Sequence, residues 1–290
     1  MTLSSIKPLL QRAYQEHYAV PLFDLFDIQG AEGMFAAAEE LHAPVIVGIY
    51  SAALKQSNAH AFAAYLRQRA LDATVPVALM LDHGASFEQC MQAITYGFTD
   101  VMYDGSKLPL DENIANTKIV VRAAHAVGVA VEAELGHVGS ASAADYQETA
   151  SQHIGFTDPV VAEQFVAETG ADFLAVAIGN AHGLYNGDPF IDLPLLADIR
   201  RRVSIPLVLH GGSGISEGQF RAAIDNGIAK INVATELYVT TAKRIRQATQ
   251  NPKATYFDLI PLVAETFKER CRYYLELFGT TGKAKYRNHL

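Results

Sequence analysis

The segment at residues 205–214, IPLVLHGGSG, joins an apolar run to a histidine and a glycine-rich turn. Short apolar runs with glycines at their ends are typical of buried parallel strands. His210, at the end of such a strand, can bind a metal or a substrate. The backbone amides of the turn, which no large side chain covers, can bind an anion.

Polar side chains that can do chemistry end five other apolar runs in the same way. They are Asp82 and His83 after residues 75–81, Asp104 after 100–103, Glu134 at the end of 129–135, His182 after 173–178, and Asn232 to Thr235 at the end of 228–233. The carboxyl ends of parallel strands lie together at one rim of a barrel or one edge of a sheet. We therefore expect these side chains to converge on one site.

Three histidines from separate strands, His83, His182 and His210, can supply three nitrogens to a zinc ion and leave its fourth position open. Each histidine taken singly is equally consistent with a buried, hydrogen-bonded side chain, so the prediction rests on their shared location. Asp82 beside such an ion can exchange a proton with a substrate hydroxyl. The alternative is that Asp82 orients a histidine.

Glu132 and Glu134 lie on the same face of one predicted strand, and two inward carboxylates need partners. Lys230 and the metal region are the candidates. Asp104 and Glu134 can form a second cation site, and a salt-bridged interior is the alternative.

Apolar runs of strand length alternate with amphipathic segments of helix length. The predicted strands are residues 19–23, 45–49, 75–81, 100–103, 129–135, 173–178, 205–209 and 228–233. The predicted helices are residues 31–41, 58–71, 86–96, 114–126, 159–169, 192–202, 216–226, 236–247 and 257–278. This alternation predicts an α/β fold, a (β/α)8 TIM barrel with an additional C-terminal helix, as a single domain over residues 1–290. An open doubly wound sheet is the alternative.

Two strand-end turns predict a phosphate site in that barrel. Residues 211–214 precede a helix that starts at about Ser216, and residues 232–235 precede one at about Glu236. Loops after the seventh and eighth strands, next to helix N-termini, are the usual phosphate site of such barrels. A long polar segment after the fifth strand, HVGSASAADYQETASQHIG, is typical of a lid or a mobile insertion.

Composition narrows the class of protein. The chain has 290 residues, a formal net charge of −8, 50% hydrophobic residues and no Trp, which allows a substantial core and argues against nucleic acid as the main partner. Cys90 and Cys271 are the only cysteines, which favours a reduced, cytoplasmic location. No apolar run approaches the roughly 20 residues of a membrane span, and MTLSSIKPLL is too short and mixed for a signal peptide.

Read together, the motifs resemble the class II (metal-dependent) ketose-bisphosphate aldolase family, most of all its tagatose-/fructose-bisphosphate branch. They are LDHG at 81–84, YDGS at 103–106, VEAELG at 131–136, AIGNAHG at 177–183, LVLHGGSG at 207–214 and KINVATEL at 230–237. The resemblance implies that Asp82 is the acid/base and that His83, His182 and His210 hold catalytic zinc, with Asp104 and Glu134 holding the metal in a displaced state.

The resemblance also implies a site for dihydroxyacetone phosphate. Its residues are Gly183, Gly211, Gly212, Ser213, Asn232, Val233, Ala234 and Thr235. A monovalent cation (Na⁺ or K⁺) near the phosphate and a homodimer or homotetramer are implied as well. The expected activity is reversible cleavage of a ketose 1-phosphate or 1,6-bisphosphate to dihydroxyacetone phosphate and an aldehyde.

Three positions depart from the family pattern. Asp24 ends the first strand, where the family usually has Asn. The loop after the fifth strand lacks the usual GGxED, and Glu148 or Tyr146 are the candidates to replace its glutamate. NPKATYFDL carries Lys253 but no arginine for a second phosphate. We therefore predict a ketose 1-phosphate substrate whose far end depends less on phosphate.

Two other functions compete with the aldolase. A metal-dependent isomerase or epimerase would use the same acid/base without cleavage, and a non-catalytic partner subunit would keep only the barrel. The intact Asp82 and three rim histidines argue against the partner subunit.

Overall fold

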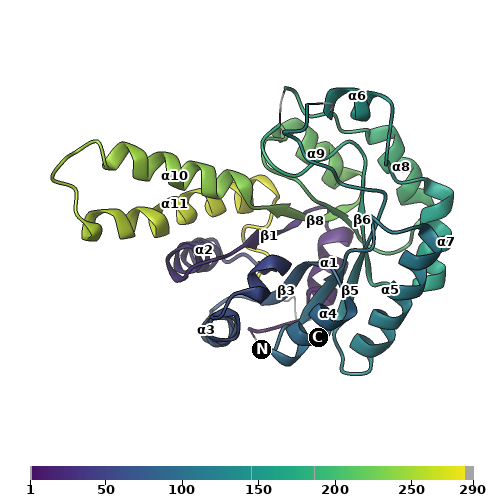
Figure 1. Ribbon diagram of the computed structural model, residues 1–290, viewed down its shortest axis with the longest axis horizontal. Coiled ribbons are helices and arrows are strands. Elements are labelled where there is room, and N and C mark those ends of the chain that lie inside the picture. The colour runs from purple at the N-terminus through teal and green to yellow at the C-terminus, as the bar shows by residue number, and fades with distance from the viewer. Residues whose placement is uncertain (1, 145, 186, 285–290) are drawn as a thin grey trace.

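The computed structural model describes residues 2–144, 146–185 and 187–284. Its eight parallel strands close into a barrel in chain order, which confirms the predicted (β/α)8 fold (Figure 1). The strands are β1 (Val20–Asp24), β2 (Val45–Tyr50), β3 (Val77–Gly84), β4 (Asp100–Tyr103), β5 (Ala130–Leu135), β6 (Phe173–Val176), β7 (Leu207–Leu209) and β8 (Ile228–Val233).

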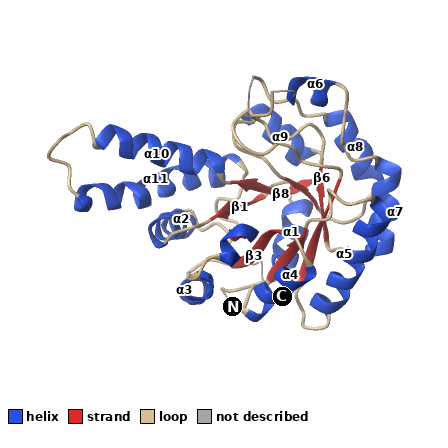
Figure 2. Ribbon diagram, viewed as in Figure 1, coloured by secondary structure: helices blue, strands red, loops and turns tan. Residues whose placement is uncertain are grey.

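Helices surround the barrel (Figure 2). They are α1 (Ile6–Gln15), α2 (Ile28–Glu40), α3 (Ala59–Asp72), α4 (Phe87–Thr95), α5 (Leu110–His125), α6 (Tyr146–Ser151), α7 (Pro159–Thr169), α8 (Leu193–Arg202), α9 (Glu217–Asp225), α10 (Thr235–Ala248) and α11 (Tyr256–Leu277), with a 3-10 turn, η1 (Ser51–Lys55). The sequence did not lead us to expect α1, η1 or α6. The other helices match the predicted ones to within a few residues.

Alternating strand residues build two apolar layers, as the period of two along a strand requires. Outward side chains of the strands pack against the surrounding helices. Inward side chains fill the lower barrel, and Ile6, Leu9, Leu10 and Ala13 of α1 pack against them. The helix α1 therefore closes the end of the barrel opposite the predicted site.

Above this apolar layer, the barrel interior is polar. Inward positions near the carboxyl ends of the strands carry buried Asp24, Asp82, Glu132, Lys230 and Asn232. Burial of so many polar groups is costly unless they pair with each other or with a ligand, so this end of the barrel is where the site lies.

The helices α10 and α11 form a hairpin that projects away from the barrel (Figure 1). Lys253 lies in the loop that joins the two helices, and Phe257, in the first turn of α11, is 83% exposed. Lys253 is not among the residues that line the cavities at the barrel rim of its own chain. None of the helices in the described ranges has the length and apolar content needed to cross a membrane.

Candidate active site

The end of β3 is distorted so that two neighbouring side chains serve the same site. Its pairing with β4 shifts register between Leu81 and Gly84, and His83 has a φ of 50°. A bulge of this kind re-aims side chains that would otherwise point to opposite faces. Left-handed backbone at a non-glycine residue is strained and is often found at functional sites. Asp82 and His83 both line the larger rim cavity as a result.

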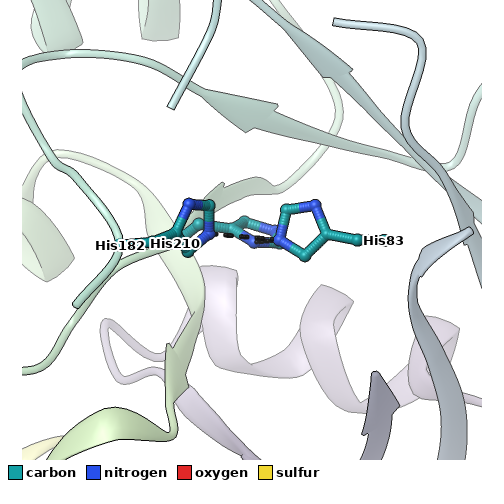
Figure 3. Close-up of side chains that lie close together, drawn as sticks. All are labelled: His83, His182 and His210. Carbon is teal, nitrogen blue, oxygen red and sulfur yellow. Dashed lines mark hydrogen bonds between the residues drawn. The ribbon is translucent and has the colours of Figure 1, made fainter. Parts of the chain in front are cut away.

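The three predicted histidines meet at the rim with their ring nitrogens facing one another (Figure 3). His83 Nε2 lies 3.1 Å from His182 Nε2 and 2.9 Å from His210 Nδ1. One ligand atom from each residue lies within 4.8 Å of the others. Side chains from β3, the segment after β6 and the end of β7 thus form one nitrogen cluster, where the sequence predicted convergence.

The second nitrogen of each ring contacts an oxygen atom. His83 Nδ1 lies 2.8 Å from Asp104 Oδ2, His182 Nδ1 lies 3.2 Å from the carbonyl oxygen of Val138, and His210 Nε2 lies 2.8 Å from Glu132 Oε1. Such contacts fix the tautomer and the orientation of a metal-binding histidine. The cluster is therefore arranged as a ligand set, with one ring nitrogen of each histidine directed inward.

The protonation states of the three rings also fit a group of metal ligands. Burial, and then the charge on His83, lower the pKa of His182 to about 4 and lower that of His210 well below its ordinary value. Burial also opposes the charged form of His83, but the charge of Asp82 and the hydrogen bond to Asp104 raise its pKa to about 10. The surrounding carboxylates thus favour one positive charge at the cluster, and neutral imidazoles beside it are the form that binds a metal.

A second group of possible ligands lies beside the first. It consists of His83, Asp104 and Glu134, again with ligand atoms within 4.8 Å of one another. Glu134 Oε2 is buried without a hydrogen-bond partner among the described residues and lies 3.8 Å from His83 Nδ1. Burial, and then the charge of Asp104, raise the pKa of Glu134 to about 8. An orphaned buried oxygen at this position is suited to receive a cation.

Glu132 pairs with Lys230, one of the two partners that the sequence suggested. Lys230 Nζ lies 2.8 and 3.0 Å from the two carboxylate oxygens, and neither side chain is exposed. The same carboxylate contacts His210. The buried pair therefore holds the ring of His210, one of the three clustered histidines, on the side away from the cluster.

Asp82 is held in place by a side chain from β8. Asn232 Nδ2 donates a 2.7 Å hydrogen bond to Asp82 Oδ1, while Asp82 Oδ2 lies 3.9 Å from His83 Nε2. Asp82 also lines both rim cavities. One carboxylate oxygen is thus fixed by the protein, which leaves the other to face a ligand.

The predicted phosphate residues surround a small cavity beside the histidines. Gly183, Gly211, Gly212, Ser213, Asn232, Ala234 and Thr235 all line it. Val233 does not, because its side chain points outward into the layer between the barrel and the helices. Gly211 has a φ of 67°, and a Cβ there would lie 2.1 Å from the carbonyl oxygen of Ala181, so only glycine fits this turn.

Two hydrogen bonds join these turns. The amide of Gly212 donates to the carbonyl of Asn232 at 3.0 Å, and the amide of Glu236 donates to Ser213 Oγ at 3.1 Å. The N-terminus of α10 follows directly at Thr235 and carries a partial positive charge. An anion here would meet the start of α10 and the remaining turn amides, since the amide of Gly212 is already bonded.

The loop after β5 positions His182 through its backbone. The amide of His182 donates to the carbonyl of Gly139, and its carbonyl accepts from the amide of Ala141. Neither candidate for the missing loop glutamate lines the rim cavities. The Tyr146 hydroxyl donates to the carbonyl of Gly179, and Glu148 is exposed on α6.

Sequence reasoning missed several supporting groups. The Tyr185 hydroxyl accepts from the amide of Ala181 and donates to the carbonyl of Gly211, which ties the two rim segments together. Lys107 and His137 line the outer part of the larger cavity, which has a volume of about 680 Å³. Lys107 directly follows the YDGS motif and could have been noticed there, whereas Tyr185 has no sequence signal.

The comparisons with known proteins agree with this geometry. The family model described as "Fructose-bisphosphate aldolase class-II" matches residues 4–283. A "Fructose-bisphosphate aldolase" of Staphylococcus aureus (strain Mu50 / ATCC 700699) is 38% identical over 290 residues, with 98% of this chain and 100% of the relative covered. The Escherichia coli (strain K12) protein YdjI, described as uncharacterized, is 39% identical over 284 residues with the same coverage.

A solved structure is similar along its whole length. The crystal structure titled "YdjI aldolase from Escherichia coli K12" superposes with a TM-score of 0.87 at 35% identity, and 98% of this chain and 100% of that chain are covered. The chain belongs to the class II fructose-bisphosphate aldolase family. Members of this family are generally metal-dependent, and the histidine cluster supplies a suitable group of ligands.

Proposed function

We propose that this protein is a zinc-dependent aldolase that reversibly cleaves a ketose 1-phosphate to dihydroxyacetone phosphate and an aldehyde. The observation that carries the proposal is the cluster of His83, His182 and His210, with Asp82 and a glycine-lined cavity beside it. Three imidazoles suit zinc, and an open fourth position suits catalysis. Bound zinc would supply Lewis-acid polarisation of the ketose carbonyl.

Other residues of the chain would bind the phosphate and transfer the proton. The small cavity, with Gly211, Ser213 and the start of α10, would hold the phosphate of the donor half. Asp82 would take the proton from the hydroxyl on the carbon that becomes the aldehyde. As that proton leaves, the carbon–carbon bond breaks and its electron pair stays on the donor half, whose carbon then takes up one proton to give dihydroxyacetone phosphate. In the reverse direction, Asp82 would return the proton to the new hydroxyl.

The far end of the substrate would lie in the larger cavity. Its described lining residues include Lys107 and His137, together with hydroxyl groups of Tyr50, Ser51 and Ser140, but no arginine. A bidentate arginine–phosphate contact is directional, and a lysine supplies its charge without its fork. This supports a substrate whose far end is less dependent on phosphate than in a bisphosphate.

Three further features are part of the proposal. The monovalent cation would lie near the phosphate, and the active form would be a homodimer or homotetramer. Two buried cysteines without a disulfide, Cys90 and Cys271, are consistent with a reduced cytoplasm. Size-exclusion chromatography with light scattering, and activity measured with and without K⁺ or Na⁺, test the first two.

The central experiment measures kcat/KM for ketose 1-phosphates of several chain lengths and for fructose and tagatose 1,6-bisphosphates, with dihydroxyacetone phosphate detected by a coupled dehydrogenase. We expect release of dihydroxyacetone phosphate and a preference for a monophosphate. A bisphosphate cleaved far better than every monophosphate would overturn the proposal for the far end. Conversion of a ketose phosphate to an isomer or epimer without cleavage would replace the aldolase with an isomerase.

A further inference from the structure

The short helix α6, in the long polar loop after β5, has no part in the site described so far. None of its residues, all of which the structure describes, lines the rim cavities. The helix lies at the outer edge of the molecule, at the top of Figure 1. Its two buried side chains are Tyr146 and Ala150, and both belong to a small apolar cluster with Ala141 and Ala181. Because Ala181 directly precedes His182, α6 packs against the segment that carries one of the clustered histidines.

The hydroxyl group of Tyr146 bonds to both ends of that segment. It donates to the carbonyl of Gly179 at 2.9 Å and accepts from the amide of Phe190 at 3.2 Å. Gly179 has a φ of 99°, and a Cβ there would lie 2.2 Å from the carbonyl oxygen of Phe190, so the two ends are in contact. The segment between them is thus a closed loop that carries His182, and one side chain from outside this loop joins its ends.

The orientation of His182 depends on the backbone around it. Its amide and its carbonyl bond to the backbone of the loop after β5, and its Nδ1 lies 3.2 Å from the carbonyl oxygen of Val138. Its Nε2 lies 3.1 Å from His83 Nε2, on the inner side of the cluster (Figure 3). A shift of the closed loop would therefore move one of the three nitrogens relative to the other two.

Both partners of the Tyr146 hydroxyl belong to the closed loop, and neither belongs to α6. Burial raises the pKa of Tyr146, so the hydroxyl keeps its proton and its role as a donor at neutral pH. The loop has a second closure beside it, because the amide of Asp192 donates to the carbonyl of Ile178 at 2.8 Å. Loss of the hydroxyl should therefore shift the loop rather than unfold it.

We propose that Tyr146 is a positioning residue that sets the place of His182 in the metal-binding cluster, and with it the affinity of the site for zinc. This inference rests on the proposed zinc-dependent function and gives α6 a role in a site that it does not touch. Removal of a group that orients a metal ligand typically weakens metal binding by about 10- to 100-fold. Tyr146 acts on His182 through the backbone, so we expect the lower end of that range.

The test is Tyr146→Phe in the full-length protein, which keeps the ring in its apolar cluster and removes both hydrogen bonds. Zinc affinity is measured by competition with a chromophoric chelator, and we expect it to fall about tenfold. The visible absorption of the protein loaded with Co²⁺ in place of zinc reports the geometry of the ligands, and its bands should change. The thermal midpoint of the metal-free variant measures the effect on folding separately.

Tyr65→Phe is the matched control, because it removes the same atom from a partly buried tyrosine. The Tyr65 hydroxyl donates to the carboxylate of Glu32, a contact between α3 and α2, and Tyr65 lines neither rim cavity. Its loss should leave the position of His182 unchanged. The zinc affinity and the Co²⁺ spectrum of this variant should therefore equal those of the wild type.

Two outcomes would overturn the inference while the proposed function stands. One is a Tyr146→Phe variant that binds zinc as tightly as the wild type, whatever its thermal midpoint, since Tyr146 would then only stabilise the fold. The other is an equal loss of zinc affinity in Tyr146→Phe and Tyr65→Phe, since the effect would then not be specific to the closed loop. A wild-type protein that binds no zinc would count against the proposed function itself.

Discussion

Glu132→Gln tests the buried group beneath the histidine cluster. The carboxylate contacts His210 Nε2 at 2.8 Å and Lys230 Nζ at 2.8 and 3.0 Å, and all three side chains are fully buried. The substitution leaves the ammonium of Lys230 buried without a counter-ion. Breaking a buried pair in this way lowers the free energy of unfolding by about 3–5 kcal/mol.

The loss in the free energy of unfolding has an upper limit, because the ammonium of Lys230 can release its proton when the variant folds. That release costs about 1.4 kcal/mol for each pH unit below about 10.4, which gives about 4.6 kcal/mol at pH 7 and about 1.9 kcal/mol at pH 9. The unfolded chain keeps this proton over the whole range while the folded variant does not. Stability of the variant relative to the wild type should therefore rise with pH.

Urea unfolding at pH 7 and pH 9 measures the loss of stability, and competition with a chromophoric chelator measures zinc affinity. We expect zinc to bind about 10- to 100-fold more weakly, because Glu132 orients the ring of His210. The double variant Glu132→Gln/Lys230→Met should recover most of the stability but not the zinc affinity.

The control is Glu163→Gln, which breaks an exposed ion pair with Arg202 and should change stability by less than about 1 kcal/mol. A Glu132→Gln protein as stable as the wild type at pH 7 would refute the reasoning, since the orphaned charge would then carry no penalty.

Three further predictions follow from the same site and from the base of the barrel. Asp82→Asn should keep zinc and phosphate binding but lose about 10²- to 10⁴-fold in turnover, and near wild-type turnover would move the acid/base role elsewhere. Chelation should abolish cleavage yet leave cooperative unfolding intact by circular dichroism, because the two apolar layers do not depend on the ion; a loss of cooperativity would contradict a purely catalytic metal. Burial raises the pKa of Asp100 to about 7, so its contribution to stability is full below about pH 4 and is lost as pH rises through 7. Urea unfolding of Asp100→Asn should show a smaller decline between pH 4 and 7, and an unchanged decline would exclude Asp100 as its source.

The barrel and the convergence of the rim residues were predictable because both follow from local patterns. Alternation of apolar runs with helical segments fixes the topology, and parallel strands bring His83, His182 and His210 to one rim wherever they fall in the chain. The pairing of Glu132 with Lys230 was predictable for the same reason, because both face inward near the rim.

Other features of the fold and the site were harder to predict from the sequence, for physical reasons. The carbonyl of Val138 orients His182, but a backbone acceptor has no signature in the sequence. Tyr146 supports the segment after β6, a contact that depends on how a long polar loop folds back. The helix α1 could have been predicted, since Ser5 caps it and Ile6, Leu9, Leu10 and Ala13 recur at helical spacing. Its position at the end of the barrel opposite the site depends on tertiary packing, which local sequence patterns do not reveal.

The position of α1 at the base of the barrel also affects the order of events in folding. The helix precedes every strand in the chain, yet it contacts Asp100 of β4 through Ser5 and Ile6, reaches Asp172 before β6 through Lys7, and packs against β8. Its docking site is complete only when the last strand has joined the first. Contacts between such distant segments form slowly, so α1 should dock late in folding. Protection of its amides in pulsed hydrogen exchange should then appear together with closure of the barrel rather than before it.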